Sequence, residues 1–234
     1  MISQVRGDST LERDRLLVVI ATIVINVAAV SLLTLAPWSD RRTGAALNLV
    51  DNCLLIGFAL VRRDALLSRF LLFGVVVGFT ELAADAWLVD YTRTLDYSIG
   101  GGPIIWRSPL WMPFAWEVVA VQFGYIGLRL WERFGKVGLL LIALLGAINI
   151  PFYEEMARRI HWWRYSPESV RGMISFTPWY IVLGEFGIAL ALAVLGRTLR
   201  RGSWRKAVIA GIGGGFSIFI CCALAFWITD RLFE

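Results

Sequence analysis

The chain has 234 residues, of which 58% are hydrophobic, and its mean hydropathy is +0.67. A soluble domain is about 45–50% apolar, so this composition excludes an ordinary soluble fold and favours a protein that crosses a membrane several times. The net charge of +5 is accompanied by no DNA- or RNA-binding motif, so nucleic acid is not an expected partner.

Long apolar runs recur along the chain, and a run of about 17–25 residues can cross the hydrocarbon of a bilayer. Because backbone groups in lipid must pair within their own segment, we expect helices. We predict an all-α bundle of seven transmembrane helices that forms one integral membrane domain over residues 1–234. A polar tail is expected over 1–15, and the spans at about 16–35, 45–61, 69–89, 110–130, 137–153, 176–196 and 207–229.

The basic residues predict an orientation, because cytoplasmic helix ends carry an excess of Lys and Arg. Most of the 23 Lys and Arg lie in the N-terminal tail and after the second, fourth and sixth spans. We therefore predict an inside N-terminus, an outside C-terminus and a location in a bacterial inner membrane. The long outer connections, 90–109 and 154–175, are rich in aromatic residues, which favours either binding loops or interfacial anchors.

Five carboxyl groups inside the expected spans are the strongest functional signal. A charge near the bilayer centre costs roughly 2.5 kcal/mol or more, so such groups usually face a bundle interior and serve a function. Two close carboxyl groups cannot easily both ionise, so one can act as an acid beside an anionic partner. Alternatively, each acid hydrogen-bonds a neighbouring helix and only stabilises packing. The candidate catalytic residues are Asp51, Glu81, Asp85, Glu117 and Glu185.

Aromatic and amide side chains on the outer side supply candidate substrate contacts. An aromatic face can stabilise a cation through its quadrupole, although Trp and Tyr also form interfacial belts. The candidate binding residues are Asn48, Trp87, Trp116, Asn149, Phe152, Tyr153, Glu154, Trp179 and Tyr180.

Other motifs restrict the alternatives. There is no P-loop, GxSxG, HExxH or Cys/His metal spacing, so neither a metal site nor a cofactor is expected. The three cysteines lie in apolar runs and are expected to be packing residues. The spacing of Gly211 and Gly215 predicts close helix packing.

Several segments together carry a family resemblance. They are Glu81 with the Gly-rich aromatic loop 97–106, the segments 113–117 and 151–155, and the Trp162-Trp163 pair before the sixth span. In these features the chain resembles small, roughly seven-helix isoprenoid-modifying membrane enzymes. These include carotenoid hydratases, heterodimer-type lycopene cyclases and integral meroterpenoid cyclases.

The resemblance implies a metal-independent, acid-initiated reaction of terpene cyclase type on a lipophilic isoprenoid dissolved in membrane lipid. A carboxylic acid would protonate an alkene or epoxide, and aromatic rings would guide the cation to ring closure or, in a hydratase, to water capture. It implies Glu81 and Asp85 as the acid pair and Glu117 as a second acid or base. Asp51 and Glu185 would be supporting groups.

Two other classes fit the residues. Intramembrane acids and proline-interrupted helices are also typical of a proton-coupled transporter or channel. We find no internal repeat, which favours the enzyme slightly, because transporters often contain repeated halves. A receptor or scaffold subunit is the third class, and its acids would tolerate replacement by amides.

Overall fold

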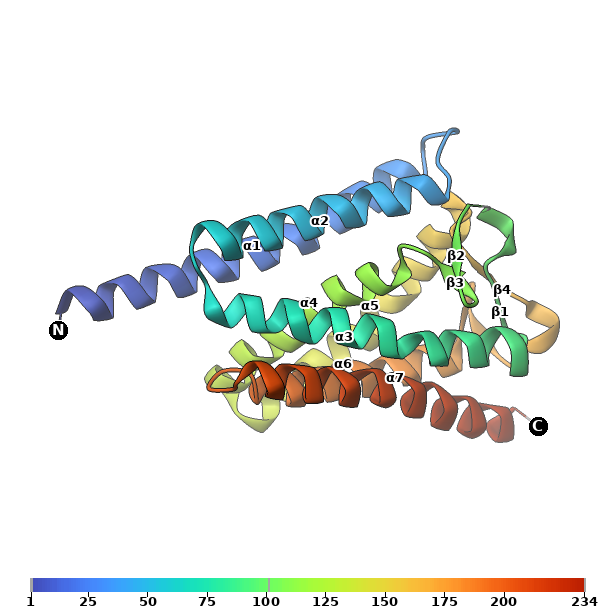
Figure 1. The fold of residues 1–234 in the computed structure, drawn as a ribbon. Coiled ribbons are helices and arrows are strands. Elements are labelled where there is room, and N and C mark those ends of the chain that lie inside the picture. Colours follow the sequence, from blue (N-terminus) through green and yellow to red (C-terminus); the bar gives the residue numbers. More distant parts are fainter. Residues whose placement is uncertain (1, 101, 234) are drawn as a thin grey trace.

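Seven long helices with short strands at one end make up the computed structural model, which describes residues 2–100 and 102–233 (Figure 1). The prediction of an all-α fold with seven helices is confirmed, and α1 extends through most of the expected polar tail. The helices are α1 (Ile2–Leu33), α2 (Arg41–Val61), α3 (Ala65–Ala86), α4 (Met112–Phe134), α5 (Lys136–Ile160), α6 (Trp179–Arg197) and α7 (Trp204–Leu232).

Six helices in the described part of the chain are long and apolar enough to cross a membrane. Helix α4 is outside this set, and its second half contains Arg129, Glu132 and Arg133. It packs against α3, α5 and α6 near the middle of the bundle. Neighbouring helices therefore cover much of its surface, and it needs fewer apolar residues than a helix that faces lipid.

Local capping determines where several helices begin. Asp40 accepts a hydrogen bond from the backbone N–H of Arg42 at the start of α2. Asp64 accepts two backbone hydrogen bonds at the start of α3 and also pairs with the buried Arg15 at 2.6 Å. Such N-caps satisfy amides that have no partner within the helix. Gly135, with φ of +59°, is the single residue between α4 and α5 and permits that sharp turn.

The two long connections, after α3 and after α5, contain the same order of elements, and we keep the name outer connections for them. The first has β1 (Leu95–Asp96), a 3-10 turn (Ser98–Gly100), β2 (Ile104–Ile105) and β3 (Ser108–Pro109) before α4. The second has β4 (Arg164–Tyr165), a 3-10 turn (Pro167–Ser169), β5 (Met173–Ile174) and β6 (Thr177–Pro178) before α6. Each connection thus forms one short strand and then a hairpin of two short strands joined by a two-residue turn. The first strands of the two connections, β1 and β4, pair antiparallel with each other.

The expectation of no internal repeat is therefore wrong at the level of structure. Each unit is a helix, a connection of this pattern and a second helix: α3 to α4, then α5 to α6. Trp106 and Ser175 are the first turn residues of the two hairpins, and both adopt positive φ. At equivalent positions the two connections share a Tyr-Ser pair, an isoleucine that ends the first strand of each hairpin, and a proline preceded by a hydroxyl residue. So little identity does not reveal the repeat in the sequence.

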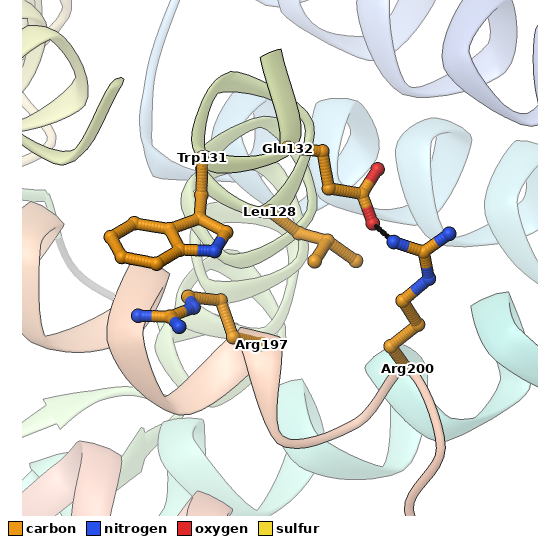
Figure 2. A pocket seen from close by; sticks show the side chains of 5 residues that line it. All are labelled: Leu128, Trp131, Glu132, Arg197 and Arg200. Atoms are coloured by element: carbon orange, nitrogen blue, oxygen red, sulfur yellow. Dashed lines mark hydrogen bonds and ion pairs between the residues drawn. The ribbon is translucent and has the colours of Figure 1, made fainter. Parts of the chain in front are cut away.

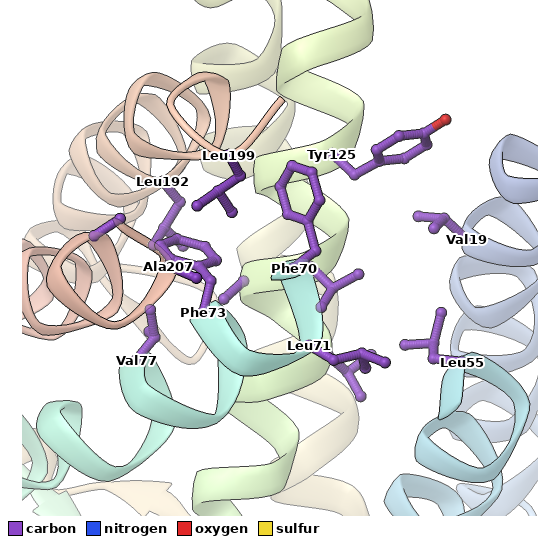
Figure 3. Close-up of a cluster of buried hydrophobic side chains, with 14 of the residues drawn as sticks. Val19, Leu55, Phe70, Leu71, Phe73, Val77, Tyr125, Leu192, Leu199 and Ala207 are labelled. Atoms are coloured by element: carbon purple, nitrogen blue, oxygen red, sulfur yellow. The ribbon is translucent and has the colours of Figure 1, made fainter. Parts of the chain in front are cut away.

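The main apolar core lies among α3, α4, α6 and α7 (Figure 3). Phe70 of α3 packs edge-on against Tyr125 of α4, with ring centroids 5.7 Å apart. Helix α7 approaches α3 closely, because a Cβ atom at Gly211 would lie 2.6 Å from Cβ of Val76, and one at Gly215 would collide with Thr80. The predicted close packing at this glycine pair is confirmed. The core thus fixes the inner four helices.

Candidate functional site

A cavity of about 390 Å³ lies among the helices and beneath the outer connections. Apolar and aromatic residues form most of its wall, and its volume is within the range of about 300–1,000 Å³ that is typical of ligand pockets. Four carboxyl-bearing residues from three helices line it: Glu81 and Asp85 of α3, Glu154 of α5 and Glu185 of α6. All four residues are buried.

Asp85 is held by donors from the first connection. Its Oδ2 atom accepts hydrogen bonds from the Tyr97 hydroxyl at 2.8 Å and from Ser108 Oγ at 2.7 Å. Burial, followed by the negative charge of Asp85, holds the pKa of Tyr97 well above its usual value. Tyr97 therefore keeps its proton and remains a donor at all ordinary pH values.

Glu154 is held in the same way by the second connection. Its carboxyl accepts hydrogen bonds from Trp163 Nε1 at 2.6 Å and from the Tyr165 hydroxyl at 3.1 Å. Burial and then the charge of Glu154 raise the pKa of Tyr165. Tyr97 comes directly after β1, and Tyr165 is the last residue of β4, the paired strand in the equivalent connection. Each repeated unit thus contributes one carboxyl group that is paired with a tyrosine.

Glu81 differs from these two acids. Both of its carboxyl oxygens are buried and lack a hydrogen-bond partner among the described residues. It lies one turn before Asp85 on α3, and both line the cavity. A buried polar atom without a partner is costly and rare, so this carboxyl is available to a ligand. In residues 2–100 and 102–233 no three His, Cys, Asp or Glu side chains are grouped to hold a metal ion.

An aromatic layer closes the cavity toward the outer connections. The Trp111 and Trp162 rings are 5.7 Å apart, the Trp162 and Trp163 rings 6.0 Å, and Tyr97 packs on Trp163 at 6.2 Å. These four residues line the cavity, and we call them the aromatic layer. Trp162 also donates a hydrogen bond to the backbone oxygen of Asp40 at 3.0 Å. This layer therefore places π faces near the carboxyl groups.

Eight of the residues predicted from the sequence line this one cavity. Three were candidate acids and five were candidate binding residues, and they come from five helices. They are Glu81, Asp85, Glu185, Asn48, Trp116, Asn149, Tyr153 and Glu154.

Two candidate acids, Asp51 and Glu117, are buried but do not line the cavity. Asp51 of α2 accepts a hydrogen bond from Asn26 at 2.6 Å, and it is Asn26 that lines the wall. Glu117 packs against α3, where a Cβ atom at Gly74 would lie 3.0 Å from its Cγ atom. The rotation of α2 and α4 about their axes directs these two carboxyl groups away from the wall.

Four candidate aromatic residues also lie outside the wall. Trp87 stacks on Tyr91 at 5.7 Å, and Phe152 packs edge-on against Tyr153. Trp179 is 39% exposed at the start of α6. Tyr180 is buried with its hydroxyl 2.6 Å from that of Thr94, which places it behind the cavity wall as a packing residue.

The sequence interpretation missed several wall residues. The aromatic residues of the long connections were left open between binding loops and interfacial anchors, so the aromatic layer and Tyr165 were not predicted as wall residues. The amides Asn26 and Gln122 were not considered. The signal that could have found the two tyrosines is the repeated Tyr-Ser pair at 97–98 and 165–166. Each pair follows a residue that becomes part of the β1–β4 ladder.

A second pocket, of about 440 Å³, lies at the opposite end of the bundle between α4 and the end of α6 (Figure 2). There the Arg197 guanidinium lies 3.4 Å from the centre of the Trp131 ring, and Arg200 pairs with Glu132. None of the predicted site residues lies there, so the candidate site is the cavity beneath the outer connections.

The family comparison covers most of this architecture. A family model described as "Domain of unknown function (DUF6989)" matches residues 82–229, from the last part of α3 to near the end of α7. The matched region contains both outer connections and Asp85, Glu154 and Glu185, whereas Glu81 lies just before it. No curated protein and no solved structure matches the chain. The chain belongs to the DUF6989 family, whose description assigns no function.

Proposed function

We propose that the protein is a membrane-embedded, metal-independent enzyme of terpene cyclase type that protonates an alkene or epoxide of a lipophilic isoprenoid. The cavity carries this proposal, because it combines four carboxyl groups with aromatic rings in a mostly apolar wall. A carboxylic acid can supply the proton, and aromatic faces can stabilise the resulting cation. An apolar wall suits a polyene that has few hydrogen-bonding groups.

The hydrogen bonds favour different roles for the acids. Glu81 is the proposed proton donor, because no described residue occupies its oxygens. Its O–H bond breaks as a new C–H bond forms at an alkene carbon, which leaves a cation on the neighbouring carbon. Asp85, held by Tyr97 and Ser108, is the anionic partner one turn away.

Glu154 is the proposed proton acceptor at the end of the reaction. The electron pair of a second alkene attacks the cation and closes a ring, and loss of a proton to Glu154 forms a new alkene. The two hydrogen bonds that Glu154 accepts, from Trp163 and Tyr165, fix its orientation toward the ligand. Capture of the cation by water instead would give the hydratase variant.

We also propose that the protein lies in a bacterial inner membrane, crosses it seven times, and has its N-terminus inside and its C-terminus outside. The positive-inside rule supports this orientation. Figure 1 supports the relative placement, because the strands and the C-terminus lie at one end of the bundle and the N-terminus at the other.

The test compares isoprenoids extracted from membranes that contain the parent protein, Glu81→Gln or Glu154→Gln, with several prenyl donors supplied. Mass spectrometry should show an isoprenoid with a changed ring count or mass in the parent only. Glu155→Gln is the matched control, because Glu155 pairs with Arg158 and Arg159 and does not line the cavity. Unchanged product in both Glu81→Gln and Glu154→Gln would refute the enzyme.

A proton-coupled transporter is the second candidate, and the two repeated units favour it. Transporters are often built from such repeats, with the binding site where the repeats meet. Here Asp85 and Glu154 come from equivalent units and line the same cavity. Proton uptake by proteoliposomes that depends on Glu81 and on an added solute, without any new isoprenoid product, would support the transporter.

A further inference from the structure

The exposure of the cavity wall is uneven. Among the described residues that line the cavity, only Leu145 and Asn149 are exposed, and Leu145 is 53% exposed. They are four residues apart and therefore lie on one face of α5. A residue that both lines a cavity and faces the outside marks an opening, so the opening lies beside this face of α5.

The outer end of the same cavity is closed. No wall residue from the two outer connections is exposed. Above the aromatic layer, β1 pairs with β4, and Asp96 pairs with Arg164 at 2.9 Å across that ladder. A ligand therefore has no exposed wall on this side through which to enter from water.

Helix α1 forms the opposite edge of the opening. Its residues Ile23 and Asn26 line the cavity and are half-buried, as is Gln122 of α4 beside them. Only 17% of the apolar part of α1 is buried, the lowest value among the six apolar helices. Helix α1 thus packs less of its apolar surface against neighbouring helices than the other five do, and a shift of its apolar part would widen the gap beside α5.

The depth of the opening in the bilayer and the polar groups at its edge indicate which kind of molecule can enter the cavity. Asn149 lies near the middle of the 25-residue α5, so the opening is at the level of the hydrocarbon and not of the headgroups. An exposed amide at that depth is costly and usually functional. Asn26, Gln122 and Asn149, from three helices, place amide groups among apolar neighbours at the edge of the opening.

We propose that the cavity opens sideways into the lipid between α1 and α5, and that it takes up a membrane-dissolved molecule with an apolar chain and a hydrogen-bonding end group. The apolar chain passes Leu145, and the amide of Asn149 offers hydrogen bonds to the polar end. This inference requires only that these helices lie in a bilayer. It does not depend on the reaction proposed above.

A thiol already present in the cavity provides the test. Cys222 of α7 lines the cavity and is 5% exposed. In a Cys53→Ala/Cys221→Ala protein it is the only cysteine. The protein is placed in lipid nanodiscs, so both faces are accessible, and is treated with phenylmercuric acetate or with the charged p-chloromercuribenzenesulfonate. Intact-mass spectrometry follows the modification with time.

We expect the apolar mercurial to modify Cys222 and the charged one to react at least tenfold more slowly. Leu145→Trp should slow the apolar reagent by roughly tenfold, because the indole fills the opening. Leu144→Trp is the matched control, because Leu144 is 42% exposed on the same helix and does not line the cavity. It should leave the rate unchanged.

Three results would overturn the inference. Equal rates for the two reagents would mean that water reaches the cavity directly. Equal rates in Leu145→Trp and Leu144→Trp would place the route elsewhere. Failure of phenylmercuric acetate to react in nanodiscs, when the same protein reacts after unfolding in detergent, would mean that the cavity is closed. Labelling needs no turnover, so an inactive protein can still show the opening.

Discussion

At the scale of single residues, two tyrosine hydroxyls orient two of the acids in the site. Asp85 and Glu154 each accept one hydrogen bond from a tyrosine of the adjoining connection. A tyrosine holds a carboxyl group with little freedom, because its ring is fixed by packing. The ring of Tyr97 is fixed by Trp163, and that of Tyr165 by Tyr180. The orientation of the acids thus depends on aromatic packing within the cavity wall and, through Tyr180, behind it.

In the proposed reaction, Tyr97→Phe should lower product formation by at least tenfold without unfolding the protein. It removes one of the two donors to Asp85 Oδ2 and leaves Ser108 as the other, and a hydrogen bond to a charged group contributes about 1.5–3 kcal/mol. Because the pKa of Tyr97 lies well above its usual value, the hydroxyl keeps its proton, and the Tyr97 side chain should contribute no ionisation of its own to the pH profile of the parent below about pH 10. Product formation measured against pH provides the check.

Tyr91→Phe is the control for this prediction. Tyr91 is 64% exposed, and its ring stacks on Trp87, so phenylalanine at this position keeps the ring contact. Turnover of this variant should equal that of the parent. Equal losses in Tyr91→Phe and Tyr97→Phe would mean that the hydrogen bond to Asp85 has no specific role.

At the scale of elements, glycines set how closely the helices approach and so where their acids lie. Gly78 faces the carbonyl oxygen of Pro113, and an added Cβ atom would overlap it. Gly78 precedes Glu81 by one turn on α3, so this contact with α4 also positions the Glu81 carboxyl. Helix spacing and acid placement therefore depend on one small residue.

Gly78→Ala should destabilise the protein by about 1–3 kcal/mol, because the methyl group must push α3 and α4 apart. Gly57→Ala in α2 is the control, since nothing lies within 4 Å of its added Cβ atom. Alanine there should be neutral or stabilising by up to about 1 kcal/mol, from helix propensity. Unfolding in a graded denaturing detergent measures both, and similar stabilities for the two variants would contradict the packing argument.

The elements also show how far the sequence could predict this molecule. Run length and apolar content predict the seven helices because lipid allows few other structures. Glu81 and Asp85 could be placed together because a spacing of four fixes a shared face. Asp51 could not be placed, because the rotation of α2 depends on packing against α1. The β1–β4 ladder joins residues about 70 positions apart, and no local pattern predicts such a pairing.

At the scale of the whole molecule, the repeated units determine how the chain must cross a membrane. The β1–β4 ladder holds both outer connections at the same end of the bundle. The chain between them is α4, one glycine and α5. If α5 crosses the bilayer, α4 must cross it too, because only then does the chain return to the same side. Helix α4, whose composition leaves it outside the set of six apolar helices, would then also cross the bilayer.

Alkaline phosphatase fusions test this topology, because that enzyme becomes active only after export across the bacterial inner membrane. Fusions after Gly102 and Gly172, in the two outer connections, should be active. Fusions after Gly135 and Gly202, in the short basic turns, should be inactive. Activity after Gly135 together with activity after Gly102 would mean that α4 stays on one side. The shared cavity between the repeated units would then be incompatible with the bilayer, and both the lateral opening and the orientation would have to be abandoned.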